Sequence, residues 1–185
     1  MGKRFTLILG GARSGKSDFA QALARQRGGD DVLFVATAEA RDDEMSARIQ
    51  SHRAARPAKW KSIEAPAALA RQLVSAPTAR VVLLDCVTLW VSNVLLANEN
   101  VSADAMASEL KDFLTWYHSS RCELIVVSNE VGMGLVPENA VGRAYRDLLG
   151  AMNKLIAAAA DEVFFVVAGL PLEIKAHAVR PENLL

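Results

Sequence analysis

Residues 10–17 constrain the chain more than any other segment. They read Gly-Gly-Ala-Arg-Ser-Gly-Lys-Ser and directly follow a short apolar run at residues 5–9. Glycines between a strand and a helix let several backbone N–H groups point at one phosphate, so the segment predicts a phosphate-binding loop rather than a chance glycine-rich turn. In such a loop Lys16 reaches the β- and γ-phosphates, and the Ser17 hydroxyl ligates Mg²⁺. The loop predicts a nucleoside triphosphate site but does not indicate the reaction.

The order of apolar and amphipathic segments predicts an α/β fold, with a mainly parallel sheet covered by helices on both faces. The expected strands are rich in Val, Leu, Ile or Phe and alternate little; they span 5–9, 32–36, 80–84, 123–128 and 162–168, with a short strand around 60–63. Helices are expected at 17–27, 43–55, 66–75, 87–98, 103–118 and 140–160. The 185 residues contain no linker or repeat, so we expect one nucleotide-binding domain over 1–185.

Composition excludes several classes of function. Lys and Arg total 21 and Asp and Glu total 21, so no general field attracts the chain to nucleic acid or to an anionic membrane. No apolar run approaches the ~20 residues of a membrane-spanning helix. Cys86 and Cys122 lack metal or redox spacing, and we expect buried free thiols. We therefore expect a cytoplasmic protein with no membrane span and no nucleic-acid partner.

An acidic residue follows one of the expected strands. Asp85 comes directly after the run at 80–84, and Asn129 and Glu130 follow the strand at 123–128. The carboxyl ends of parallel strands meet where ligands bind, so these residues are expected near the phosphate loop. A carboxylate in the position of Asp85 orients Mg²⁺, directly or through water. Many buried strands end in Asp for structural reasons, and this alternative stays open.

A histidine among arginines is the second candidate for chemistry. In the helix expected at 43–55, Met45, Ile49 and His52 fall on one line, so His52 is expected to face the protein. Arginines at 48, 53 and 56 surround it in the sequence. Nearby positive charge favours neutral imidazole, the nucleophilic form, and the same arginines would hold a triphosphate against it. The alternative is a half-buried histidine with a structural role.

The segment 129–139 is an unusual loop. It combines Gly132 and Gly134 with apolar side chains, among them Val131, Met133 and Leu135. Such side chains are unfavourable in water, which predicts either a binding loop or a segment that folds back on the core or on a partner subunit.

Together these motifs resemble the adenosylcobinamide kinase/adenosylcobinamide-phosphate guanylyltransferase family of cobalamin biosynthesis. The similarity spans almost the whole chain and lies in residues 10–17, 36–38, 42–45, 48–50, 52, 56–57, 128–139 and 157–163. It implies a P-loop NTPase fold with a RecA-like sheet, a homotrimer, and two reactions. A nucleoside triphosphate such as ATP phosphorylates adenosylcobinamide; GTP then donates GMP to that phosphate through a guanylylated His52, giving adenosylcobinamide-GDP and pyrophosphate. Some relatives carry a histidine pair here, whereas this chain has Ser51 before His52.

The resemblance also implies the site residues. His52 and Lys16 would be catalytic, and Ser17 and Asp85 would bind Mg²⁺. Guanine needs an acceptor for its N1–H and amine, a role that suits the Glu64 carboxylate. The residues implied to bind nucleotide are Gly10, Gly11, Ala12, Arg13, Ser14, Gly15, Lys16, Ser17, Ala36, Thr37, Ala38, Arg53, Ala54, Ala55, Arg56, Glu64 and Asp85.

Two other functions compete with this one. A single-activity P-loop kinase for a small molecule would need no special histidine. A RecA-like ATP-binding module acting on nucleic acid would need a basic stripe interleaved with aromatic residues, which the sequence lacks.

Overall fold

The structure, a computed structural model, describes residues 3–54, 56–98 and 101–179, apart from the side chains of residues 44, 48 and 52. The strands are β1 (Phe5–Gly10), β2 (Val32–Ala36), β3 (Lys61–Glu64), β4 (Val81–Asp85), β5 (Glu123–Asn129), β6 (Glu162–Val167) and β7 (Leu170–Glu173). The helices are α1 (Lys16–Gly28), α2 (Asp43–Ala54), α3 (Leu69–Val74), α4 (Val87–Ala97), α5 (Ala103–Ser119) and α6 (Ala140–Ala159).

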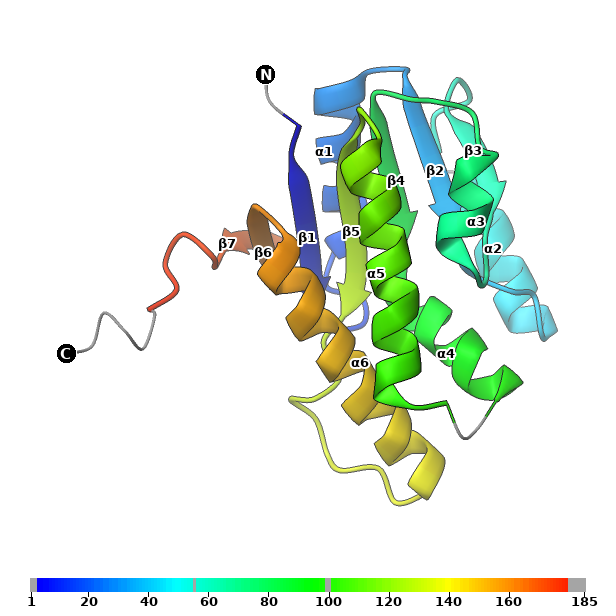
Figure 1. The fold of residues 1–185 in the computed structure, drawn as a ribbon, viewed down its shortest axis with the longest axis vertical. Helices are drawn as coiled ribbons and strands as arrows, with labels where there is room; N and C mark the ends of the chain where they lie inside the picture. The colour runs from blue at the N-terminus through cyan, green and yellow to red at the C-terminus, as the bar shows by residue number, and fades with distance from the viewer. Residues whose placement is uncertain (1–2, 55, 99–100, 180–185) are drawn as a thin grey trace.

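The seven strands form one sheet in the order β3-β2-β4-β5-β1-β6-β7. All neighbouring strands pair in parallel except β6 and β7, which pair antiparallel. The predicted mainly parallel sheet is therefore confirmed. In Figure 1 the arrowheads of β1, β2, β4 and β5 point to the lower end of the molecule, where α2, α4 and the segment before α6 also lie.

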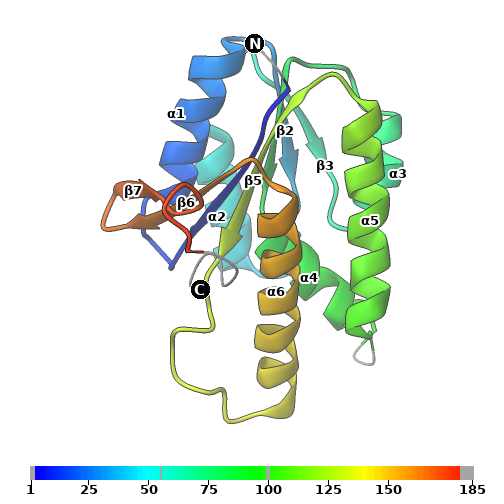
Figure 2. The ribbon, with the colours of Figure 1, turned by 60° about the vertical axis from the view of Figure 1, so that its left-hand side comes forward.

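Side chains of the central strands alternate between two buried cores. Leu7 and Val126 belong to the core that α3, α4, α5 and α6 cover, whereas Ile8, Phe34 and Ile125 belong to the core that α1 covers. Figure 2 shows the two layers of helices on opposite sides of the sheet. Helices cover both faces as predicted, and burial on both sides explains why the strands read as continuous apolar runs.

The sequence did not predict β7. Residues after 169 include Pro171, which lacks the N–H that a central strand needs, but β7 lies at the sheet edge, where proline is tolerated. Val167 pairs with Leu170, so Ala168 and Gly169 form a two-residue hairpin turn. Their φ values of 51° and 80° are those such a turn requires.

Within the described residues no helix has both the length and the apolar character to cross a membrane. Both cysteines are free and buried, as predicted.

A charged network joins α1 to the first residue of β6. Arg27 donates to Glu162 at 2.7 Å and to the Thr6 hydroxyl at 2.9 Å, and that hydroxyl in turn donates to Glu162 at 2.9 Å. Arg4 also donates to Glu162, at 2.8 Å, but its side chain is half exposed. Burial alone would raise the pKa of Glu162; the hydrogen bonds from Arg27 and Thr6 and the charges of both arginines outweigh burial and lower it.

This network predicts a pH-dependent contribution to stability. Glu162→Gln should lower the free energy of unfolding by about 1–2 kcal/mol at pH 7, because it weakens the Arg27 pair. Because the pKa of Glu162 is lower in the folded chain than its ordinary value of 4.5, its ionised carboxylate stabilises the fold fully above pH 4.5. This stabilisation is lost as the pH falls through the folded-state pKa. The difference between variant and wild type, measured by urea denaturation, should therefore shrink as the pH falls below 4.5 and disappear once the pH lies below the lowered folded-state pKa of Glu162.

Arg4→Gln is the matched control. Its exposed pair should contribute less than about 0.5 kcal/mol. An effect of Arg4→Gln as large as that of Glu162→Gln would contradict the role given to Arg27.

Candidate nucleotide-binding site

The register of the sheet brings the predicted site residues to one edge. Ala36 at the end of β2 lies opposite both Glu64 of β3 and Asp85 of β4. Gly10 at the end of β1 lies opposite Asn129 of β5. Five neighbouring strands thus end in predicted ligand-binding positions on the same side of the sheet, as expected for parallel strands.

The phosphate loop packs tightly against the β6–β7 hairpin. A Cβ at Gly10 would lie 2.6 Å from the carbonyl oxygen of Val166 and 2.6 Å from Ser14 Oγ, so only glycine fits. Gly15 has a φ of 89°, and a Cβ there would lie 3.2 Å from Gly169 Cα. The Gly169 N–H donates to the Ser14 carbonyl at 2.8 Å and holds the loop in place.

The start of α1 is built to bind an anion. Gly15 is the N-cap and supplies no side-chain hydrogen bond, so the first N–H groups of the helix remain for another acceptor. Lys16 Nζ donates to the Gly11 carbonyl at 3.0 Å and thus lies over the loop. Ser14 Oγ is buried without a hydrogen-bond partner in the described part of the chain. These groups together fit a phosphate.

A cleft of about 130 Å³ lies beside the phosphate loop. Its walls come from the phosphate loop, from the ends of β2, β4 and β5, and from α2 and α4. The lining residues are Lys16, Ser17, Ala36, Ala38, Met45, Ile49, Arg56, Asp85, Cys86, Thr88, Leu89 and Asn129. The cleft therefore gathers predicted nucleotide or metal residues from four separate segments of the chain, together with the two apolar residues that precede His52 on α2.

Buried hydrogen bonds fix the strand end that carries Asp85. The Thr37 hydroxyl donates to the Cys86 carbonyl at 2.7 Å and accepts from the Cys86 N–H at 2.8 Å. Asn93 Nδ2 donates to the Thr37 carbonyl at 2.7 Å. The fully buried Thr37 thus holds the backbone beside Asp85, and its direct contact with a nucleotide stays a prediction. Burial raises the pKa of the Cys86 thiol to about 11, so this cleft residue stays protonated.

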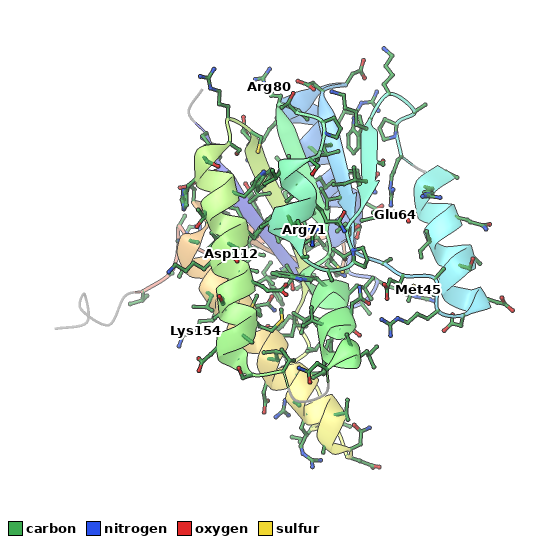
Figure 3. The ribbon with its side chains drawn as sticks, turned by 45° about the vertical axis from the view of Figure 1, so that its right-hand side comes forward. Met45, Glu64, Arg71, Arg80, Asp112 and Lys154 are labelled. Carbon is green, nitrogen blue, oxygen red and sulfur yellow. The ribbon has the colours of Figure 1, made fainter. Side chains whose placement is uncertain are left out.

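Two arginines lie at and just after the end of α2, and one of them, Arg56, lines the cleft. The Arg56 guanidinium lies 3.6 Å from the centre of the Phe34 ring, and its buried Nε has no hydrogen-bond partner among the described residues. Burial lowers the pKa of Arg56, whereas the Asp85 charge opposes this change. Arg53, at the end of α2, forms an exposed ion pair with Glu64, the predicted guanine acceptor. In Figure 3 Met45 and Glu64 lie on the side of the molecule that α2 occupies.

Some predictions fall outside the described part of the chain. His52 occupies a position in α2, three residues after Ile49, but its side chain is not described; the same holds for the side chain of residue 48. Ala55 lies outside the described residues. Arg13 is exposed in the loop with a φ of 56°, and Ala12 is exposed beside it. The predicted roles of all these residues stay predictions.

Comparison with known proteins identifies the family. The sequence profile described as cobinamide kinase/cobinamide phosphate guanyltransferase matches residues 6–174. The chain belongs to this family. The family's activities make it a kinase and a nucleotidyltransferase of cobalamin biosynthesis, as the sequence motifs predict.

Relatives in this cobinamide kinase family are similar over nearly their whole length. The bifunctional adenosylcobalamin biosynthesis protein CobP of Pseudomonas aeruginosa is 45% identical over 91% of this chain and 96% of its own. CobU of Salmonella typhimurium, which carries the same description, is 42% identical over 91% of this chain and 98% of its own. Among solved structures, an ATPase domain that is 15% identical has a TM-score of 0.50, covering 88% of this chain and 69% of that one. That likeness concerns the fold alone, and it confirms the predicted P-loop α/β fold.

Sequence reasoning missed three residues of the cleft. Cys86, Thr88 and Leu89 line it because α4 begins directly after the strand end that carries Asp85. Their position after a strand that ends in a predicted metal ligand was a usable sign, since the loop or helix after each parallel strand lies at the ligand-binding edge.

Replacement of Thr37 tests the support of Asp85. Thr37→Val should lower the free energy of unfolding by about 1–3 kcal/mol, because it leaves the buried N–H of Cys86 unpaired and removes one of two hydrogen bonds to the Cys86 carbonyl, which also accepts from the Trp90 N–H at 3.2 Å. Thr37→Ser retains the hydroxyl and should cost about 0.8 kcal/mol for the lost methyl group. Urea denaturation measures both, and equal effects of the two variants would show that the hydroxyl does not hold this strand end.

Proposed function

We propose that the chain phosphorylates adenosylcobinamide with a nucleoside triphosphate and then transfers GMP from GTP to the product through a guanylylated His52. The observation that carries this proposal is the cleft beside the phosphate loop, which combines a triphosphate site with α2 as one of its walls. Three details go beyond the activities of the family. They are the use of His52 as the nucleophile, the adenosyl form of cobinamide as the substrate, and ATP and GTP as the phosphoryl and GMP donors.

In the kinase step the phosphate loop holds the γ-phosphate. Lys16, the N–H groups at the start of α1 and the Ser14 hydroxyl stabilise charge on the phosphoryl oxygens as the acceptor hydroxyl attacks the γ-phosphorus. The bond to the β–γ bridging oxygen breaks, the nucleoside diphosphate leaves, and the acceptor hydroxyl loses its proton. For such a transfer the protein needs only to position the reactants and to stabilise the charge on the phosphoryl oxygens.

In the second reaction an imidazole nitrogen of His52 attacks the α-phosphorus of GTP and pyrophosphate leaves. The phosphate of cobinamide phosphate then attacks the same phosphorus and releases His52. Position 52 supports this role because Met45 and Ile49, seven and three residues earlier on α2, line the cleft. A covalent intermediate splits one difficult transfer into two easier ones.

Glu64 is proposed to select guanine. Its carboxylate is exposed at the end of β3, opposite Ala36 of the cleft, and accepts a hydrogen bond from Arg53. Two carboxylate oxygens match the N1–H and amine of guanine, while adenine offers no such pair of donors on that edge.

The residues present fit a magnesium ion that arrives with the triphosphate. Among the described residues no cluster of three or more His, Cys, Asp or Glu side chains is suited to a metal, so a resident all-protein site does not form there. Mg²⁺ in triphosphate sites needs only one or two protein oxygens besides phosphates and water. Ser17 and Asp85, which line the same cleft, would supply these oxygens. When bound, the ion would neutralise phosphate charge.

The proposal also includes a homotrimer in the cytoplasm, as the family resemblance implies. The exposed Leu170 and Leu172 of the edge strand β7 support self-association, since an uncovered apolar edge strand favours pairing with another chain.

Separate loss of the two activities tests the roles of His52 and Lys16. With GTP labelled at its α-phosphate, His52→Ala should lose covalent labelling but retain kinase activity, because only the transfer step needs the imidazole. Lys16→Ala should lower both activities about 100-fold or more, since one cleft serves both. Mass spectrometry should place an acid-labile, base-stable GMP on His52 in the wild type.

His118→Ala is the matched control, because this histidine lies exposed near the end of α5. Its replacement should change neither the covalent labelling nor the kinase activity. Full guanylyl transfer by His52→Ala would refute the covalent role. Kinase activity without any labelling of the wild type would favour the single-activity kinase.

The same labelling assay tests Glu64. Glu64→Gln should reduce the preference for GTP over ATP in the labelling step by about 10- to 100-fold, because the amide replaces one acceptor with a donor. Loss of the exposed Arg53 pair should hardly change stability. An unchanged preference would assign guanine recognition to other residues.

A further inference from the structure

The segment between β5 and α6 exposes large apolar side chains at the carboxyl edge of the sheet. Met133, Leu135 and Val136 are 79%, 96% and 64% exposed. Val131, at the start of the segment, is half-buried against the core. The sequence left open whether this segment binds a ligand or folds back on the core or on a partner subunit, and the exposure of residues 133, 135 and 136 argues against contact with the core. Three exposed apolar side chains so close in sequence indicate a binding surface.

Hydrogen bonds hold this segment in a defined shape. Glu130 Oε1 accepts from the Gly132 N–H at 2.6 Å. Arg143 of α6 donates to the carbonyls of Pro137 and Glu138 at 3.0 and 2.6 Å. Because the surface is preorganised, a ligand that binds there pays little for ordering the chain.

Asn129 connects the segment to the nucleotide cleft, which it lines. Its N–H donates to Thr88 Oγ1 at 2.8 Å, and its carbonyl accepts from Asn153 Nδ2 at 2.9 Å. The next N–H, of Glu130, donates to the Gly10 carbonyl at 3.2 Å. The apolar surface therefore begins at the wall of the cleft, directly beside the phosphate loop.

Buried polar atoms at this junction retain hydrogen-bonding capacity. Ser128 Oγ, Asn129 Oδ1 and Asn153 Oδ1 are buried, and none has a hydrogen-bond partner within the described residues. Burial raises the pKa of Tyr145 to about 12, so its hydroxyl stays protonated and donates to the Thr88 carbonyl at 3.3 Å. Since buried polar atoms are normally paired, those without a partner indicate a place for a hydroxyl group or an ordered water.

We propose that the corrinoid acceptor binds on the surface formed by residues 131–136, with its hydroxyl-bearing arm passing over Asn129 into the cleft. This inference rests on the function proposed above and adds the position of the acceptor. A corrinoid is a broad macrocycle that carries methyl groups, so it matches Met133, Leu135 and Val136, while its arm matches the polar junction. From there the hydroxyl oxygen reaches the γ-phosphorus, forms the new P–O bond and releases its proton, and the nucleoside diphosphate leaves with the bridging oxygen.

A second copy of the chain is the other occupant that an apolar surface of this kind fits. The continuity of the 131–136 surface with the cleft through Asn129 favours the substrate, because the acceptor must lie across this junction to be phosphorylated. The edge strand β7, with exposed Leu170 and Leu172, offers a separate place for contact between copies.

The double variant Met133→Asp/Leu135→Asp tests the proposal. Its KM for the corrinoid in the kinase assay should rise about tenfold or more, with kcat within about twofold of the wild type, because apolar contact is lost away from the reacting atoms. Labelling by GTP should not change. Val74→Asp is the matched control, since Val74 on α3 is 75% exposed and no residue of α3 lines the cleft; its KM should equal that of the wild type.

An unchanged KM in the double variant would overturn the proposal. A lower mass of the double variant than of the wild type in light scattering would also overturn it, because the surface would then be an interface between copies. A trimer of the wild type has a mass of three times 19.9 kDa. If the wild type shows neither kinase activity nor labelling, the proposed function has failed. In that case calorimetry still tests the docking surface by comparing the corrinoid affinities of the wild type and the double variant. Equal affinities, or no binding to the wild type, would refute the proposed docking surface.

Discussion

The packing of the phosphate loop against the β6–β7 turn determines where the rest of the site lies. Gly10 and Gly15 leave no space for side chains, and the Gly169 N–H donates to the Ser14 carbonyl at 2.8 Å. The loop is thereby fixed at the end of β1, and the N-cap Gly15 leaves the first N–H groups of α1 without a side-chain cap. In the proposed function a triphosphate held there would lie near the ends of β5 and β4, which follow β1 in the sheet, so the sheet register would decide which side chains reach each phosphate. The β6–β7 hairpin, whose strand β7 the sequence did not predict, thus supports the phosphate loop, the motif that the sequence predicted most clearly.

The parallel register turns distant segments into one site. Residues 36, 64 and 85 are far apart in sequence, yet they end neighbouring strands at the same level. Residue 129 ends β5 two residues beyond Val127, the partner of Asp85, and lies opposite Gly10. Each strand end is then secured separately: the Thr37 hydroxyl binds the backbone of Cys86, and Thr88 and Asn153 bind the backbone of Asn129. The Thr37 bond is buried and the two bonds to Asn129 are partly buried, where polar groups are normally paired. The cleft is thus bounded by strand ends with paired backbone groups and by α2, which adds none of its described residues to either core.

Local patterns predicted the features that local chemistry determines. Apolar runs identified five strands correctly, and the glycine-rich loop indicated the nucleotide site, because burial on two faces and tight turns constrain composition directly. The short strand expected around 60–63 corresponds to β3 (Lys61–Glu64), which is mostly exposed. The strand β7 escaped prediction because only its edge position makes Pro171 acceptable. The partner of the Thr37 hydroxyl is the backbone of Cys86, 49 residues away, so no local sequence window contains this contact. For residues 131–136 the sequence left two outcomes open, since exposure is a property of the folded neighbourhood.

One triphosphate site must serve two reactions at different phosphorus atoms, and the walls of the cleft suggest how. Met45 and Ile49 place α2 on one side, whereas Thr88 and Asn129 form the other. In the proposed mechanism a nucleophile on α2 reaches the α-phosphorus from the first side, and the acceptor reaches the γ-phosphorus from the second. The steps must then alternate, because the phosphate loop holds one triphosphate at a time. Under this proposal the phosphorylated arm would need no new binding mode for the second reaction, because GMP carried by α2 and a phosphate held beside Asn129 would face each other across the cleft.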